Sequence, residues 1–119
     1  MKLFLDSQRQ RLIANGQTNL QRRHDGQDEI DFKPVVKLFT PDGGATWLLT
    51  EIIPDEPDLA CGLCDLGLGS PELGTVSLTE LASVRGRIGL PIERDRWFEA
   101  DRTLSQYADE ATKAGHIRA

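Results

Sequence analysis

The clearest pattern of apolar and polar positions lies between Pro34 and Pro54, in the stretch PVVKLFTPDGGATWLLTEIIP. Two runs rich in β-branched and bulky apolar residues, 35–39 and 46–50, flank a Pro-Asp-Gly-Gly segment. This composition is typical of two strands joined by a tight turn. Apolar residues occupy both alternating sets of positions, so neither face of the pair is consistently polar. The stretch therefore predicts a central β-hairpin that is covered on both faces.

Shorter patterns after the hairpin predict two more strands and a helix. The run LACGLCDL at 59–66 is typical of a third strand, and 75–78 of a fourth, short strand, with a glycine-rich loop between them. Ser77 and Glu80 have the spacing of a capping box, in which each side chain bonds a backbone amide at the start of a helix. We expect that helix near 78–84.

The last third of the chain predicts an extended segment and the clearest helix. A proline opens the extended segment 92–98. Thr103 and Gln106 repeat the capping-box spacing, and Gly115 provides a stop. Between them, apolar residues recur three and four positions apart on one helical face: Leu104, Tyr107, Ala108 and Ala111. We expect a helix near 104–114 whose apolar face packs on the sheet.

The N-terminal residues predict a short helix followed by a loop. Asp6 or Ser7 provides an N-cap, and the Asn-Gly pair at 15–16 has the composition of a helix stop. Residues 17–31 are polar and without periodicity, so we expect a flexible surface loop there. Together the elements predict one α+β domain over residues 1–119, with a mainly antiparallel sheet of about four to five strands.

Charge is distributed unevenly along the chain. The 119 residues carry 14 Lys and Arg and 19 Asp and Glu, a net charge of −5. Residues 38–84 contain eight acidic residues and no Lys or Arg, which argues against phosphate binding in this part. The arginines that follow alternate with acids, and we expect intramolecular pairing of four of them: Arg85, Arg87, Arg94 and Arg96. We therefore expect no direct nucleic-acid binding.

The remaining composition indicates a cytoplasmic protein without cofactors. No segment approaches the roughly 18 apolar residues of a membrane span, and the N-terminus lacks a signal-peptide core. The two cysteines, Cys61 and Cys64, are too few for a disulfide framework. Because they stand three apart on a predicted strand, their thiols point to opposite faces. This favours buried structural cysteines over a redox pair or a zinc half-site, and we expect no metal and no catalytic cysteine.

Carboxylates near the predicted strand ends form a candidate polar pocket. Strand alternation predicts that Glu51 lies on the same side as Trp47 and Leu49, where burial raises a carboxyl pKa. Such a group serves acid–base chemistry, or binds a divalent ion together with a second carboxylate. The candidate pocket contains residues from four predicted elements: Trp47, Glu51, Asp65, Glu72, Arg94 and Asp95.

Acidic residues in predicted turns form a candidate contact surface: Asp42, Asp55, Glu56 and Asp58. The last three lie between and beside two prolines without the spacing of a calcium loop, which is typical of a solvated turn. The aromatic residues Trp47, Trp97 and Phe98 are expected to pack in the core rather than to line a ligand site.

Four segments together resemble a known bacterial family: VVKLFTPDGGATWLLTE, GLCDLGLGSPELGTVSLTEL, GLPIERDRWF and LSQYADEA. Over about residues 34–111 and the short helix before them, the chain is similar to the domain of unknown function numbered twenty-nine fifty-eight. Members of that family are often carried on plasmids and other mobile genetic elements. The resemblance implies a cytoplasmic accessory protein of such elements, and it implies no particular activity, cofactor or catalytic residue.

We therefore expect a protein that acts by contact with an unidentified protein partner through its acidic surface. Two alternatives remain open. One is inhibition of a host DNA-binding defence enzyme, of the anti-restriction or anti-CRISPR type, by charge mimicry. The other is a small enzyme or divalent-metal-binding domain, which requires the carboxyl groups of Glu51, Asp65 and Glu72 to share one cleft.

Overall fold

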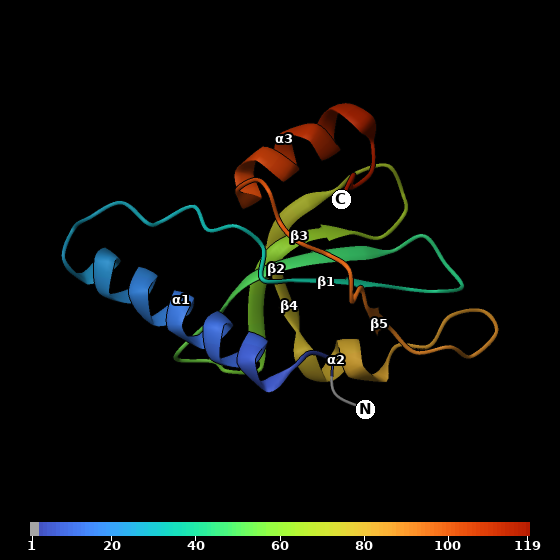
Figure 1. The fold of residues 1–119 in the computed structure, drawn as a ribbon, viewed down its shortest axis with the longest axis horizontal. Helices are drawn as coiled ribbons and strands as arrows, with labels where there is room; N and C mark the ends of the chain where they lie inside the picture. Colours follow the sequence, from blue (N-terminus) through green and yellow to red (C-terminus); the bar gives the residue numbers. More distant parts are fainter. Residues whose placement is uncertain (1–2) are drawn as a thin grey trace.

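The computed structural model describes residues 3–119, which form a five-stranded sheet in the order β4-β3-β2-β1-β5 (Figure 1). Every strand pairing is antiparallel, so the predicted α+β class with an antiparallel sheet is confirmed. The predicted hairpin is formed by the first two strands. The strands are β1 (Val36–Phe39), β2 (Thr46–Ile52), β3 (Leu59–Asp65), β4 (Glu72–Ser77) and β5 (Glu93–Arg94).

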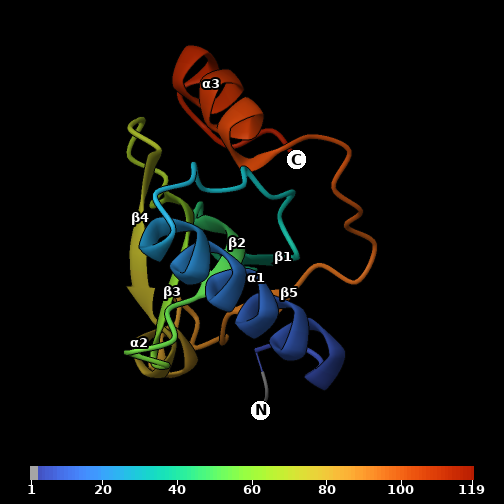
Figure 2. The ribbon, with the colours of Figure 1, turned by 90° about the vertical axis from the view of Figure 1, so that its left-hand side faces the viewer.

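Helices cover both faces of this sheet, as Figures 1 and 2 show. The helices are α1 (Asp6–His24), α2 (Leu78–Ser83) and α3 (Leu104–Ala114). On one face, Leu12 of α1 and Leu81 of α2 belong to the same buried cluster as Trp47. On the other face, Tyr107 of α3 packs in a second cluster with Leu48. β2 contributes to both clusters, which confirms that it is central and covered on both faces.

The C-terminal helix agrees with its prediction from the sequence. The capping box at Thr103 and Gln106 is present, and Gly115 ends the helix with φ 81°. Tyr107 and Ala111 are buried, and Leu104 is partly buried against the same cluster. The apolar stripe of α3 therefore faces the sheet. Burial of this stripe removes its apolar side chains from water, which favours the packing.

The predicted helix stop at 15–16 is wrong, and the loop predicted over 17–31 begins only after His24. Helix α1 continues through both residues to His24, and a shorter irregular segment then leads to β1. Gly16 lies inside the helix, at a position where only glycine fits. A Cβ at this position would lie 1.9 Å from the carbonyl oxygen of Ile52. The Asn-Gly pair marks the point where the helix crosses β2, not its end.

The boundaries of two strands differ from the sequence predictions. β4 begins at Glu72, earlier than the expected strand at 75–78, and pairs with β3 along its full length. β5 contains two residues, because the chain turns away from β1 after Arg94, whereas the sequence predicted an extended segment over 92–98. The helix expected near 78–84 is present as α2, and the Ser77 side chain accepts a hydrogen bond from Glu80 N. In the part of the chain that is described, no helix is long and apolar enough to cross a membrane.

Candidate binding cleft beside Glu51

A transverse row of three polar side chains crosses the sheet near its β4 edge. The strand register pairs Glu51 of β2 with Cys61 of β3, and Cys61 with Thr75 of β4. Directly paired residues of antiparallel strands point to the same face, so these side chains form one row. They line a cleft of about 480 Å³, which is flanked by Leu73 of β4 and by the first residue of α3, Leu104.

Helix α1 closes the other end of the cleft. β1 begins at Val36, opposite Leu49, so the last residues of β2 extend beyond it. There α1 takes the position of a neighbouring strand: the Asn15 side chain donates to the carbonyl oxygen of Thr50 at 3.0 Å. The helix thus satisfies strand backbone that β1 leaves without a partner.

Asn19, which the sequence analysis did not single out, connects this helix to the cleft. Its amide nitrogen donates to Glu51 Oε2 at 3.0 Å and to the carbonyl oxygen of Ile30 at 3.1 Å. Its side-chain oxygen accepts from Ile30 N at 2.8 Å. Asn19 is 1% exposed, so these bonds replace water that the amide has lost. Its place one helical turn after Asn15 was the available signal, since both lie on one helix face.

The cleft is acidic, and the pKa of the Glu51 carboxyl in it is raised. Burial raises the pKa of Glu51; the Asn19 hydrogen bond opposes this rise, the Glu29 carboxylate adds to it, and the Arg23 guanidinium opposes it. Arg23 and Glu29 form an ion pair of 2.6 Å on the α1 side of the cleft. Two carboxylates and one guanidinium leave a net negative charge that suits a cationic group.

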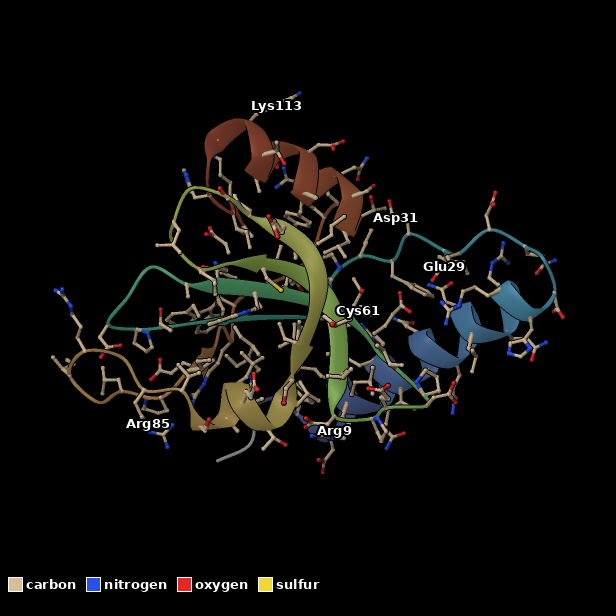
Figure 3. The ribbon with its side chains drawn as sticks, turned by 180° about the vertical axis from the view of Figure 1, so that it is seen from behind. Arg9, Glu29, Asp31, Cys61, Arg85 and Lys113 are labelled. Atoms are coloured by element: carbon tan, nitrogen blue, oxygen red, sulfur yellow. The ribbon has the colours of Figure 1, made fainter. Side chains whose placement is uncertain are left out.

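The thiol of Cys61 is held in its neutral form. Burial raises its pKa, and the carboxylates of Glu51 and Glu29 raise it further. Burial also raises the pKa of Cys64, which pairs with Trp47 on the opposite face of β3. The expected separation of the two thiols is confirmed, but both are partly exposed rather than fully buried. Figure 3 shows Cys61 on the sheet and Glu29 on the segment beside it.

The candidate pocket predicted around Glu51 is not assembled. A register shift between Leu49 and Glu51 makes Thr50 an extra residue in β2. The shift reverses the alternation, so Glu51 shares a face with Cys61, whereas Trp47 shares the other face with Cys64. The prediction that Glu51 lies on the same side as Trp47 is therefore wrong.

The other members of that pocket lie elsewhere. Glu72 pairs with Cys64 and points to the face opposite Glu51. Asp65 lies four residues along β3 from Cys61, about 13 Å away. Its carboxylate is 2% exposed and accepts from Gly67 N at 2.8 Å and Ile117 N at 2.9 Å, so it fastens the C-terminal segment.

Arg94 and Asp95 belong to the opposite edge of the sheet, beyond β1. Asp95 forms an ion pair of 3.4 Å with Lys37. Among residues 3–119 no group of three or more His, Cys, Asp or Glu side chains is arranged to hold a metal ion.

The predicted acidic contact residues occupy the two ends of β2. Asp42 lies in the turn before β2, where its Oδ2 accepts from Ile88 N at 2.9 Å. Asp55, Glu56 and Asp58 lie in the turn after β2, about 23 Å away along a strand of seven residues. Asp58 is engaged with the start of α2, accepting from Thr79 N at 2.9 Å. The structure therefore does not join Asp42 to the other three.

Two expectations about aromatic and basic residues are also wrong. Trp47 is buried as expected, but Trp97 is 92% exposed. Within the described residues, the expected ion pairs of the late arginines are not present. Arg85 instead donates to the backbone carbonyls of Ala82 and Val84.

Comparison with known proteins gives one match. The model of a family described as protein of unknown function (DUF2958) matches residues 3–118. No curated protein and no solved structure matches the chain.

Proposed function

This protein belongs to the family DUF2958, whose model covers nearly the whole chain, and we propose that it acts by binding another protein through the β4 edge of its sheet. The proposal rests on the observation that this edge of the sheet is not covered by another strand. β4 has one neighbour, β3, and Figure 2 shows no other element beyond it. An edge strand presents unpaired backbone N–H and C=O groups, onto which an extended partner segment can add as a further strand.

The composition of β4 leaves this edge unprotected. Proteins commonly block exposed edges with lysine, with proline or with a bulge. The strand ELGTVS contains neither lysine nor proline, its register with β3 is continuous, and its one charged residue, Glu72, lies at its first position. Exposed leucines lie on β4 and in the loop before it, with 57% of Leu73, 62% of Leu66 and 82% of Leu68 exposed. These side chains supply apolar contact area for a partner.

The Glu51 cleft supplies charge specificity beside this edge. Leu73 and Thr75 of β4 line it together with Glu51. A strand added to β4 places alternate side chains above this face of the sheet, and a lysine or arginine there pairs with the cleft carboxylates. The proposed partner therefore presents an extended segment with a basic side chain. In this proposal Glu51 and Glu29, rather than the four turn acids expected from the sequence, supply the acidic contact. Such a role suits the accessory function in mobile genetic elements that the family resemblance implies.

Affinity purification of the tagged protein from a bacterial host, followed by mass spectrometry, tests the proposal when matched variants are compared. We expect Leu73→Lys to abolish recovery of the partner, because an edge lysine blocks strand addition and Leu73 is exposed enough to be replaced without unfolding. Glu51→Gln should weaken recovery because it removes the charge of the cleft. Leu90→Lys, at a residue 40% exposed near the opposite edge, is the control and should leave recovery unchanged.

Hydrogen exchange on the recovered complex gives the second measurement. The amides of β4 that point away from β3 should exchange more slowly when the partner is bound. A partner that is retained fully by Leu73→Lys, without protection of β4, would contradict the proposal. A homodimer of the wild type that Leu73→Lys converts to a monomer would identify a second copy of this chain as the occupant.

A further inference from the structure

A second groove lies at the opposite edge of the sheet and differs from the cleft in charge. It has a volume of about 410 Å³ and is formed by β5, by the turn that follows β5 and by Phe39 of β1. Figure 1 shows the loop between α2 and β5 projecting beyond the sheet on this side. The groove does not involve β4 or the Glu51 cleft, so the inference is independent of the proposed function.

The groove presents two aromatic side chains. Trp97 is 92% exposed. Burying its large apolar side chain would stabilise the fold, so its exposure is unfavourable for stability. Its position is set by hydrogen bonds: Asp95 Oδ1 accepts from Trp97 N at 2.9 Å, and Asp95 in turn pairs with Lys37 of β1. Phe39 is partly exposed in the same groove. The fold thus holds the indole out of the core on a turn that is anchored to the sheet.

The side chains of the arginines around the groove have no partner in the described part of the chain. Across residues 3–119, the side chains of Arg87, Arg94 and Arg96 form no hydrogen bond and no ion pair, although the Arg94 backbone is part of β5. Two acids, Glu93 and Asp95, also line the groove. Asp95 is paired with Lys37, so Glu93 is the acid that opposes anion binding there. Arg94 and Arg96 line the groove with Trp97. Their guanidinium groups are therefore available to an anion. This removes one of the two reasons for which the sequence argued against nucleic acid, the expected pairing of these arginines.

We propose that this groove binds single-stranded nucleic acid. A base stacks on Trp97, and the phosphates beside it pair with Arg94 and Arg96. Phe39 pairs with Glu93 and faces the side of the sheet opposite Arg94, so it is not part of this stacking contact. Stacking requires unpaired bases, so a duplex, whose bases already stack on one another, is the weaker ligand. An acidic protein would pair with the arginines but would leave the exposed face of Trp97 without a specific role. The net charge of −5 limits the affinity, and binding depends strongly on salt.

The test measures binding of a fluorescein-labelled oligothymidylate of about ten nucleotides to the full chain. The fluorescence of the two tryptophans provides a second measurement of binding, because Trp47 is 5% exposed and Trp97 is 92% exposed. We expect the oligonucleotide to quench the exposed tryptophan. Trp97→Ala should remove that quenching and weaken binding about tenfold or more. Thymidine monophosphate and a duplex of the same length are the comparison ligands, and both should bind more weakly.

The electrostatic contribution is measured with arginine variants. Arg94→Gln combined with Arg96→Gln should weaken binding and reduce the slope of log affinity against log salt by about 1.4, since each phosphate contact on a single strand contributes about 0.7. Arg11→Gln, an exposed arginine on α1, is the matched control and should change neither quantity. The folded state of each variant is checked by its thermal unfolding.

Three results would overturn the proposal. The first is no binding of the oligonucleotide at about 50 mM salt. The second is binding that survives both Trp97→Ala and the double arginine variant. The third is an acidic peptide, such as polyglutamate, that binds with the same dependence on the arginines while the oligonucleotide does not; the groove would then be a site for an acidic protein.

Discussion

Helices α1 and α3 dock on the same sheet by different physical means. α3 presents an apolar stripe to one face, where Tyr107 and Ala111 are buried. α1 crosses the end of β2, where β1 no longer accompanies the strand, and its contacts there are largely polar. Asn15 and Asn19 bond to β2 at Thr50 and Glu51, and Gly16 lies against the Ile52 carbonyl.

The difference shows what each docking surface demands. A sheet face offers apolar side chains, so the helix that covers it needs an apolar stripe. A strand edge offers backbone groups that must be hydrogen-bonded, so the helix beside it needs amide side chains and a residue small enough for close approach. The candidate cleft lies between these two junctions, with Asn19 supporting Glu51 on one side and Leu104 of α3 on the other.

The largest expected effect comes from the apolar junction. Tyr107→Ala should lower the free energy of unfolding by about 3–5 kcal/mol, because it empties the site that a buried ring fills between α3 and the sheet. Urea denaturation measures this. Tyr107→Phe is the control: it keeps the ring and loses the hydroxyl bond of 3.0 Å to Asp101, so it should cost about 1 kcal/mol. Equal losses in the two variants would show that α3 does not dock through this ring.

A smaller effect, with an informative sign, is expected at the polar junction. In an isolated helix Gly→Ala is favourable by about 1 kcal/mol. Here Gly16→Ala should instead destabilise the protein by about 1–3 kcal/mol, because the methyl group meets the backbone of Ile52. Thermal unfolding measures this. Gln17→Ala, at the exposed residue next to Gly16, is the control and should change stability by less than about 0.5 kcal/mol. A stabilising Gly16→Ala would mean that α1 does not approach β2 so closely.

The smallest effect concerns the carboxylate between the two junctions. The pKa of Glu51 is raised above its ordinary value of 4.5, so the folded protein disfavours the ionised form. The resulting penalty is absent below that value and develops as the pH rises through the pKa of the folded state. Glu51→Gln keeps an acceptor for Asn19 and does not ionise. It should therefore stabilise the protein at neutral pH by at most a few tenths of a kcal/mol, since Glu51 is partly exposed and screened by solvent.

Denaturation of both proteins across the acidic range measures this difference. The advantage of Glu51→Gln should disappear in acid, where the wild-type carboxyl is protonated as well. A difference in stability that does not change with pH would mean that ionisation of Glu51 is not its cause.

One cause of the failed prediction of the candidate site lies at a single residue of β2. Alternation along a strand is a reliable guide only while the register is continuous, and the extra residue Thr50 moves Glu51 to the other face. Nothing in the letters TWLLTEI marks the shift, because a bulge depends on how the neighbouring strand and helix meet the backbone. Asn19 was missed for a similar reason: its three hydrogen bonds join residues 11 and 32 positions away.

The sequence by itself determined the elements whose cause is local. The hairpin follows from two apolar runs around a turn, and α3 from an apolar stripe with a capping box and a terminal glycine, because periodicity and end signals act within a few residues. Only the tertiary structure decided the length of α1. Its Asn-Gly pair has the local composition of a helix stop, but in the fold the helix continues and Gly16 packs against the Ile52 carbonyl. Contacts between residues distant in the sequence outweighed that local preference, and they also placed Glu51 in an acidic cleft and left Trp97 exposed at the opposite edge.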